Sequence, residues 1–179
     1  MNVYVESNFI LELVLEQEEC LACEEILALA EAEAISLRVP AYALLEPWET
    51  ITRRKVRWAE LGQSIYRDVQ QVVRTASLAG EANALRDLML KASEYAAARL
   101  DAFRARTLAA SIVIGIDGAT LASADDLRRR FGALKLPDAV MLAAVLGDLD
   151  GSDALFVNRN RKDFNDPDIQ SDLAGRGCP

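Results

Sequence analysis

Short apolar runs recur along the chain and are separated by longer segments in which apolar residues follow a helical spacing. The runs are continuous rather than alternating, which is typical of parallel strands that are buried on both faces. They predict strands at residues 3–5, 34–39, 111–116 and 154–157. A strand, a helical segment and another strand form a right-handed crossover by default. The pattern therefore predicts an α/β fold, with a parallel sheet covered by helices on both faces.

The segments between the runs predict helices at residues 9–33, 119–131 and 138–146. The first of these segments contains no proline or glycine, and we expect it to form two consecutive helices. Ser7 or Asn8 can serve as the N-cap, because a short polar side chain accepts a hydrogen bond from the first turn. Beyond Phe164 the chain is rich in Asp, Asn, Pro and Gly. We expect this tail to be irregular.

The middle of the chain is helical in pattern almost throughout, from about residue 48 to residue 107. One apolar face repeats at helical spacing and consists of Ile51, Trp58, Leu61, Ile65, Val69, Val72 and Val73. Gly80 predicts a turn, so we expect a helical hairpin inserted at about residues 52–110. Pro47 predicts a kink or a restart of the helix beside Glu46. The hairpin packs on the rest of the domain, or it forms a dimer contact or one wall of a substrate groove.

Composition places the chain among ordinary globular proteins and narrows its chemistry. The chain has 179 residues, 51% apolar and 27% charged, which predicts a single domain spanning residues 1–179. It has no signal-peptide pattern and no run of about 20 apolar residues, so we expect a cytoplasmic protein without a membrane partner. The absence of histidine excludes Ser-His and Cys-His nucleophilic sites and His-ligated zinc. Cys20 and Cys23 lie in a helical pattern, and we interpret them as packing residues.

Acidic or amide side chains end the apolar runs at widely separated positions, namely Glu6, Glu46, Asp138 and Asn160, and Asp163 lies near the last of these. Because ligands of parallel sheets bind at the carboxyl ends of the strands, we expect these side chains to converge there. Two carboxylates about 4 Å apart repel by about 4 kcal/mol at an effective dielectric of about 20. A carboxylate cluster without histidine therefore favours Mg²⁺ or Mn²⁺. Taken singly, Asp138 also suits a helix first turn, and Glu46 could pair with Arg53.

The net charge of −8 by itself argues against a nucleic-acid partner, but the basic residues are clustered. Local patches decide phosphate binding. The residues that we predict to contact a nucleic-acid backbone are Arg53, Arg54, Lys55, Arg159, Arg161 and Lys162. A further cluster at residues 128–130 is interpreted as a solvated helix face.

Four segments of this sequence resemble the motifs of the PIN-domain family of VapC-like nucleases. V-Y-V-E-S-N-F-I is similar to the opening motif, a hydrophobic strand followed by Asp-x-Asn, and A-L-L-E-P-W-E resembles the helix that carries a glutamate. L-K-L-P-D-A-V-M-L-A-A resembles the most specific motif, in which an aspartate opens a helix. L-F-V-N-R-N-R-K-D-F resembles the closing strand and turn. The resemblance covers about residues 1–51 and 112–166 and excludes the hairpin.

The resemblance implies a three-layer α/β/α fold and an Mg²⁺- or Mn²⁺-dependent endoribonuclease, of the kind found in many toxin–antitoxin pairs. Glu6 stands where the family has its first aspartate, while Glu46 and Asp138 match the next two acids. These three residues are the implied metal ligands. Asn160 stands where a fourth aspartate is common, and Asp163 lies nearby as a substitute.

Further residues are implied in supporting roles. Asn8 matches the small polar residue that follows the first acid, and Thr50 follows Glu46 by about one helical turn. The implied partners are RNA, an antitoxin protein and a second copy of the chain in a homo-oligomer.

Two departures from the family pattern support an alternative function. Glu6 is one methylene longer than aspartate, and Asn160 is neutral. The alternative is a catalytically weakened PIN-like module that binds a partner or RNA. Receiver-like and haloacid-dehalogenase-like phosphotransfer domains also gather acids at strand ends. The latter needs Asp-x-Asp after the first strand, and Glu6-Ser7-Asn8 lacks that nucleophile.

Overall fold

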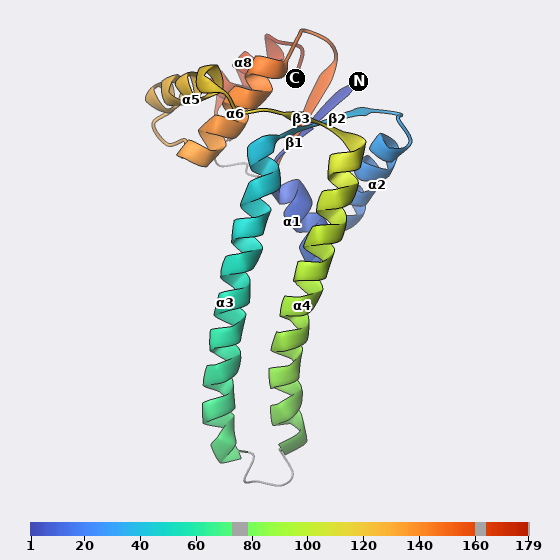
Figure 1. Cartoon of the computed structure of the whole chain (residues 1–179). Coiled ribbons are helices and arrows are strands. Elements are labelled where there is room, and N and C mark those ends of the chain that lie inside the picture. Colours follow the sequence, from blue (N-terminus) through green and yellow to red (C-terminus); the bar gives the residue numbers. More distant parts are fainter. Residues whose placement is uncertain (73–78, 160–163, 179) are drawn as a thin grey trace.

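The computed structural model describes residues 1–72, 79–159 and 164–178. Within these residues a parallel sheet has the strand order β3-β2-β1-β4 (Figure 1). Its strands are β1 (Asn2–Val5), β2 (Ser36–Pro40), β3 (Ser111–Ile114) and β4 (Ala154–Val157). Each strand falls within two residues of its predicted position, and the predicted α/β fold is confirmed. In the register, Val5 pairs with Val157, so the residues that follow β1 and β4 lie side by side at the carboxyl ends of the strands, which we call the carboxyl edge of the sheet.

The helices are α1 (Ser7–Leu15), α2 (Cys20–Glu31), α3 (Ala41–Val72), α4 (Ala79–Ala110), α5 (Gly118–Arg130), α6 (Leu136–Asp148) and α8 (Pro167–Ala174). They cover the two faces of the sheet around two hydrophobic clusters. Val3 and Val5 pack with α1, α2 and the bases of α3 and α4. Tyr4 points to the opposite face and packs with α5, α6 and α8, because successive strand residues alternate between faces. The result is the three-layer arrangement implied by the resemblance.

The helices α3 and α4 form a hairpin that extends away from the sheet (Figure 1). Each contains 32 residues, about 48 Å at a rise of about 1.5 Å per residue. The base of the hairpin is anchored by the buried side chains of Ile51, Ala96 and Leu100. Farther out, apolar side chains such as Leu61 and Leu88 are exposed. None of the described helices combines the length and apolarity needed to cross a membrane.

Several local expectations were wrong. Of the kink or restart expected beside Glu46, the restart is absent, because Pro47 lies inside helix α3 and buried Leu44 and Ile51 hold the helix on both sides of the proline. Gly80 lies within α4 rather than at a turn. The N-cap of α1 is Glu6, without a side-chain capping bond, rather than Ser7 or Asn8.

The tail beyond Phe164 is not irregular, because α8 begins at Pro167. The carboxylate of Asp166 accepts a hydrogen bond from the backbone N–H of Asp168 and so caps this helix. Ile169 and Leu173 are buried against α5 and α6, which stabilises a helix of only eight residues.

The cysteines are free thiols, as the interpretation of Cys20 and Cys23 as packing residues requires. Cys23 is buried, and burial raises the pKa of its thiol to about 11. A thiol with this pKa is protonated near neutral pH and is a poor nucleophile.

Candidate metal centre

Glu6 stands at the junction between β1 and α1 and is 3% exposed. Its Oε1 accepts a hydrogen bond of 2.9 Å from Asn8 Nδ2 and one of 2.8 Å from the backbone N–H of Arg159. One donor comes from the start of α1 and the other from the segment that follows β4. Because charge-assisted hydrogen bonds of this length are strong, they hold the Glu6 carboxylate at the carboxyl edge of the sheet.

Asp138 lies in the first turn of α6 and is 9% exposed. Pro137 precedes it at the helix start, where its fixed φ suits the first turn. Glu46 comes from α3 and is half-buried. The three acids line one cavity of about 170 Å³, together with Ser7, Asn8, Leu11, Lys135 and Pro137. Glu6 and Glu46 are 40 residues apart in the sequence and Asp138 lies 92 residues beyond Glu46, yet the three side chains line a common space.

The neighbourhood of this cavity is electronegative. Tyr42, half-buried on α3, has a pKa above its ordinary value, first because its phenol is buried and then because Glu46, Glu49 and Asp138 oppose a further negative charge. The positive charge of Arg53 lowers the pKa of Tyr42. Glu46 and Asp138 are therefore close enough to act on the same phenol.

Within residues 1–72, 79–159 and 164–178, no group of three or more acidic or cysteine side chains is spaced to hold a metal ion. The acids share the cavity without forming a closed set of ligands. This donor set still suits Mg²⁺, which in proteins commonly binds one or two carboxylates directly and keeps several water molecules.

The supporting and basic residues predicted from sequence are only partly located. Arg53 Nη2 donates to Thr50 Oγ1 over 3.3 Å, and these residues lie about one turn (Thr50) and two turns (Arg53) beyond Glu46 on α3. Arg54 is half-buried and Lys55 is exposed farther along the same helix. The remaining predicted residues, Asn160, Arg161, Lys162 and Asp163, lie outside the described residues.

Arg159, predicted to contact nucleic acid, has its guanidinium group among acidic and amide side chains. It forms an ion pair with Glu12 and another, of 3.1 Å, with Glu18. It also donates to Gln17 Oε1 over 3.4 Å. These partners lie in α1 and in the connection to α2.

Sequence reasoning missed two charged residues at this edge of the sheet. Lys135 is exposed at the N-cap of α6 and lines the cavity, and its place two residues before Pro137 in the third motif was the available signal. Glu12 is 2% exposed. Its signal was a carboxylate inside the apolar run I-L-E-L-V-L.

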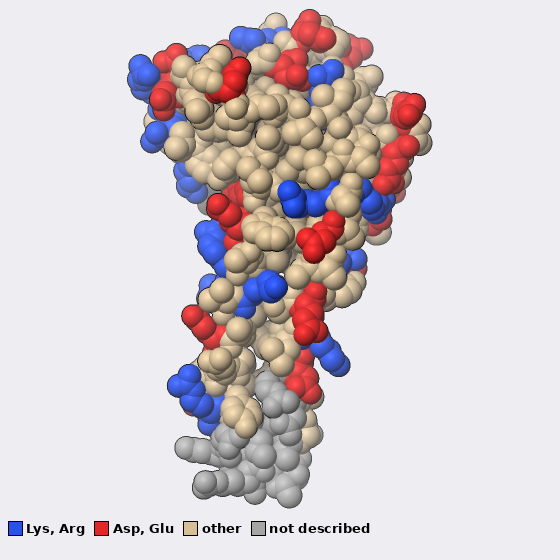
Figure 2. All heavy atoms as spheres, viewed as in Figure 1, with Lys and Arg blue, Asp and Glu red and all other residues tan. Residues whose placement is uncertain are grey.

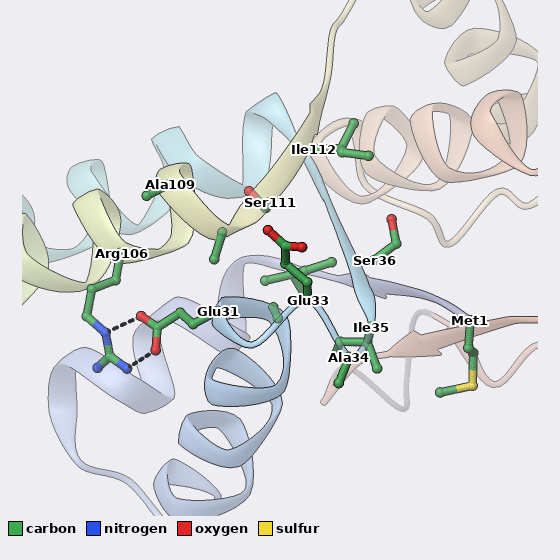
Figure 3. Close-up of a pocket in the computed structure, with 13 residues that line it drawn as sticks. Met1, Glu31, Glu33, Ala34, Ile35, Ser36, Arg106, Ala109, Ser111 and Ile112 are labelled. Atoms are coloured by element: carbon green, nitrogen blue, oxygen red, sulfur yellow. Dashed lines mark hydrogen bonds and ion pairs between the residues drawn. The ribbon is translucent and has the colours of Figure 1, made fainter.

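A larger hollow of about 770 Å³ lies at the opposite edge of the sheet (Figure 3). It is lined by Met1 and by Ser36 and Ser111, the first residues of β2 and β3. Its Glu31 is paired with Arg106 at 2.8 Å. None of the residues predicted from sequence to form a site lines this hollow, so its size does not make it the candidate centre.

Comparisons with known proteins address the fold. No protein-family model and no curated protein matches the sequence. The structure is similar to a solved structure of VapBC2 from Rickettsia felis bound to a DNA fragment from their promoter, a PIN-domain toxin–antitoxin complex. The TM-score is 0.54 with 13% sequence identity, and the match covers 92% of each chain. The fold is that of a PIN domain. At this identity the likeness concerns the PIN fold alone, and the acids of this chain have to be judged by their own geometry.

Charge on the surface of this PIN fold is mixed. Figure 2 shows acidic and basic side chains interspersed along the exposed face of the hairpin, without a continuous basic stripe in that view. The charge on this face of the hairpin therefore does not favour binding of an RNA backbone along it.

Proposed function

We propose that this chain is a PIN-type endoribonuclease that cleaves RNA phosphodiesters with Mg²⁺ or Mn²⁺. The observation that carries the proposal is the single cavity lined by Glu6, Glu46 and Asp138 at the carboxyl edge of a parallel sheet. Ligands of such sheets bind at this edge. Burying two carboxylates beside a third is costly unless a cation or a proton neutralises them.

Each residue has a definite role in this proposal. Glu6, Glu46 and Asp138 supply oxygen ligands, directly or through water, and Asn8 holds Glu6 in place through its hydrogen bond. A bound divalent cation supplies a Lewis acid for the phosphate and lowers the pKa of water. Lys135, at the exposed rim of the cavity, attracts the phosphate by its charge.

Residues close to Arg159 and Glu46 in the sequence position the water and the RNA. Asn160 and Asp163 position the attacking water. Arg53 and Thr50, hydrogen-bonded to each other on α3, steady the phosphate. Arg54, Lys55, Arg161 and Lys162 hold the RNA backbone, where contacts to phosphate fix the register without reading the sequence.

The partners proposed are an antitoxin protein and a second copy of this chain. VapBC2 is a toxin–antitoxin complex, which supports the first. The exposed apolar side chains of the hairpin support the second, because large exposed apolar surfaces commonly mark protein contacts.

A second candidate function is a non-catalytic PIN-like module that binds RNA or a protein. Two observations favour it: no closed set of metal ligands is present among the described residues, and Glu6 already accepts two hydrogen bonds on one oxygen. Direct titration with Mn²⁺ separates the two functions, because a module without a metal site gives no saturable binding at this cavity.

Asp138→Asn tests the proposed nuclease. Removing this charge should reduce Mn²⁺ affinity and Mn²⁺-dependent RNA cleavage by at least about 100-fold, because a ligand and its charge are lost together. Calorimetric titration and cleavage of a labelled RNA measure the two effects. Asp148→Asn is the control, since it removes a carboxylate near the other end of the same helix, where Arg38 pairs with it at 2.7 Å. Wild-type cleavage by purified Asp138→Asn protein would refute the assignment.

A further inference from the structure

Glu12 is a buried carboxylate that the proposed reaction does not use. It lies on α1, is 2% exposed, and both of its oxygens are bonded. Oε2 accepts a hydrogen bond of 3.0 Å from the backbone N–H of Glu19, and Oε1 accepts one from Nη1 of Arg159. A buried carboxylate needs such partners, because desolvation of an unpaired charge is costly.

Arg159, the partner of Glu12, also contacts the candidate metal centre. The side chain of Arg159 is held by Glu12 and Glu18, and its backbone N–H donates to Glu6 Oε1 over 2.8 Å. Fixing the side chain of Arg159 therefore also fixes the main-chain donor that orients Glu6. A hollow of about 240 Å³ beside the candidate cavity is lined by Glu6, Glu12 and Arg159 together.

We infer that Glu12 and Arg159 form a positioning pair, which locks the segment after β4 against α1 and so orients Glu6 for cation binding. The inference rests on the proposed function and deepens it. It also gives Arg159 a role that differs from contact with the nucleic-acid backbone. Partners that orient a metal ligand typically change metal affinity by about 10- to 100-fold when they are removed.

Charge alone predicts a different result, which makes the pair testable. Glu12→Gln removes a negative charge near the cavity, whereas Arg159→Met removes a positive one. By charge alone, the first would weaken Mn²⁺ binding and the second would strengthen it. A positioning pair predicts that both substitutions weaken it, because either one releases the main chain at residue 159.

The experiment is an Mn²⁺ titration of the full chain, followed by calorimetry or electron paramagnetic resonance, on Glu12→Gln, Arg159→Met and the double variant. We expect each single variant to lose about 10-fold in affinity. The double variant should lose no more than either single variant, because both act through one contact. Asp148→Asn, which breaks the ion pair with Arg38 at the other end of α6, controls for a general loss of stability and should keep wild-type affinity.

Several outcomes would overturn the inference. Unchanged or tighter Mn²⁺ binding by Arg159→Met would do so, as would additive losses in the double variant. If Glu12→Gln does not fold, Arg159→Met carries the test, because its side chain is 45% exposed. Glu6→Gln separates a failure of the metal centre from a failure of the positioning role: if it leaves Mn²⁺ binding unchanged, the proposed metal centre fails. If it abolishes binding while the pair variants bind normally, only the positioning role fails.

Discussion

At the scale of single residues, the informative feature is which polar groups are buried. Glu6 and Asp138 are almost fully buried at the edge of the sheet, and charged residues are rarely buried without a partner. Glu46 is half-buried beside them. The negative charge of Glu46 and Asp138 also affects Tyr42. The pKa of this tyrosine is raised first by burial and then by Glu46, Glu49 and Asp138.

Tyr42 therefore provides a probe of the candidate centre. Glu46→Gln should lower the pKa of Tyr42, because the carboxylate that most strongly opposes ionisation of the phenol is removed, and saturation with Mn²⁺ should also lower this pKa. Phenolate absorbance during an alkaline titration, corrected with a Tyr42→Phe variant, measures the shift. An unchanged titration in Glu46→Gln would contradict the electrostatic picture.

The sign of the accompanying stability change follows from the same shift. The pKa of the Tyr42 phenol is raised in the folded protein. The contribution of this phenol to the free energy of unfolding is therefore fully present at pH values below its pKa in the unfolded chain. That contribution is lost as the pH rises through the folded value.

At the scale of elements, helix α3 both carries Glu46 and forms half of the hairpin. Its continuity through Pro47 is unusual, since an interior proline removes a hydrogen bond and crowds the preceding turn. Buried Ala43, Leu44 and Ile51 anchor this part of the helix to the core. Tertiary packing thus maintains a helix that local propensity disfavours.

Pro47→Ala should consequently stabilise the protein. Alanine restores the missing donor and removes the clash, and we expect an increase of about 1–3 kcal/mol in the free energy of unfolding. Urea denaturation followed by circular dichroism measures it. Mn²⁺ affinity should change little if Glu46 keeps its position. A loss of stability would show that the buried proline ring contributes more by packing than it costs in the helix.

At the scale of the whole molecule, a compact α/β body carries a long hairpin (Figure 1). Of the part of the hairpin that the structure describes, the base is packed on the body, through residues such as Ile51, Leu100 and Phe103. Farther out, Leu61, Leu85 and Leu88 are 46%, 43% and 58% exposed. Such exposure on two neighbouring helices is typical of a contact surface.

The predicted homo-oligomer is tested on this surface. The paired substitution of Leu61→Lys and Leu88→Lys should convert the oligomer to a monomer, because charges would replace apolar contacts, while Mn²⁺ affinity stays at the wild-type value. Light scattering coupled to size-exclusion chromatography measures the mass. Leu121→Lys on α5, where the side chain is 51% exposed, is the matched control. A wild-type monomer would refute the predicted homo-oligomer.

Elements with a local signal could be predicted from the sequence. Continuous apolar runs identified the strands to within two residues, because burial on both faces leaves few polar positions. Helical spacing identified the hairpin, and the apolar lead-ins to Glu6, Glu46 and Asp138 indicated three residues that line one cavity. These features depend on neighbours in the chain, which the sequence displays directly.

Features that depend on distant partners could be seen only in the folded molecule. The pair of Glu12 and Arg159 joins residues 147 positions apart, and nothing near either residue announces the other. The continuity of α3 through Pro47 and the helical tail at Ile169 also depend on burial against other elements. Local preferences are worth about 1 kcal/mol or less for most residues and about 3 kcal/mol for an interior proline, and at these positions the packing of several buried side chains outweighs them.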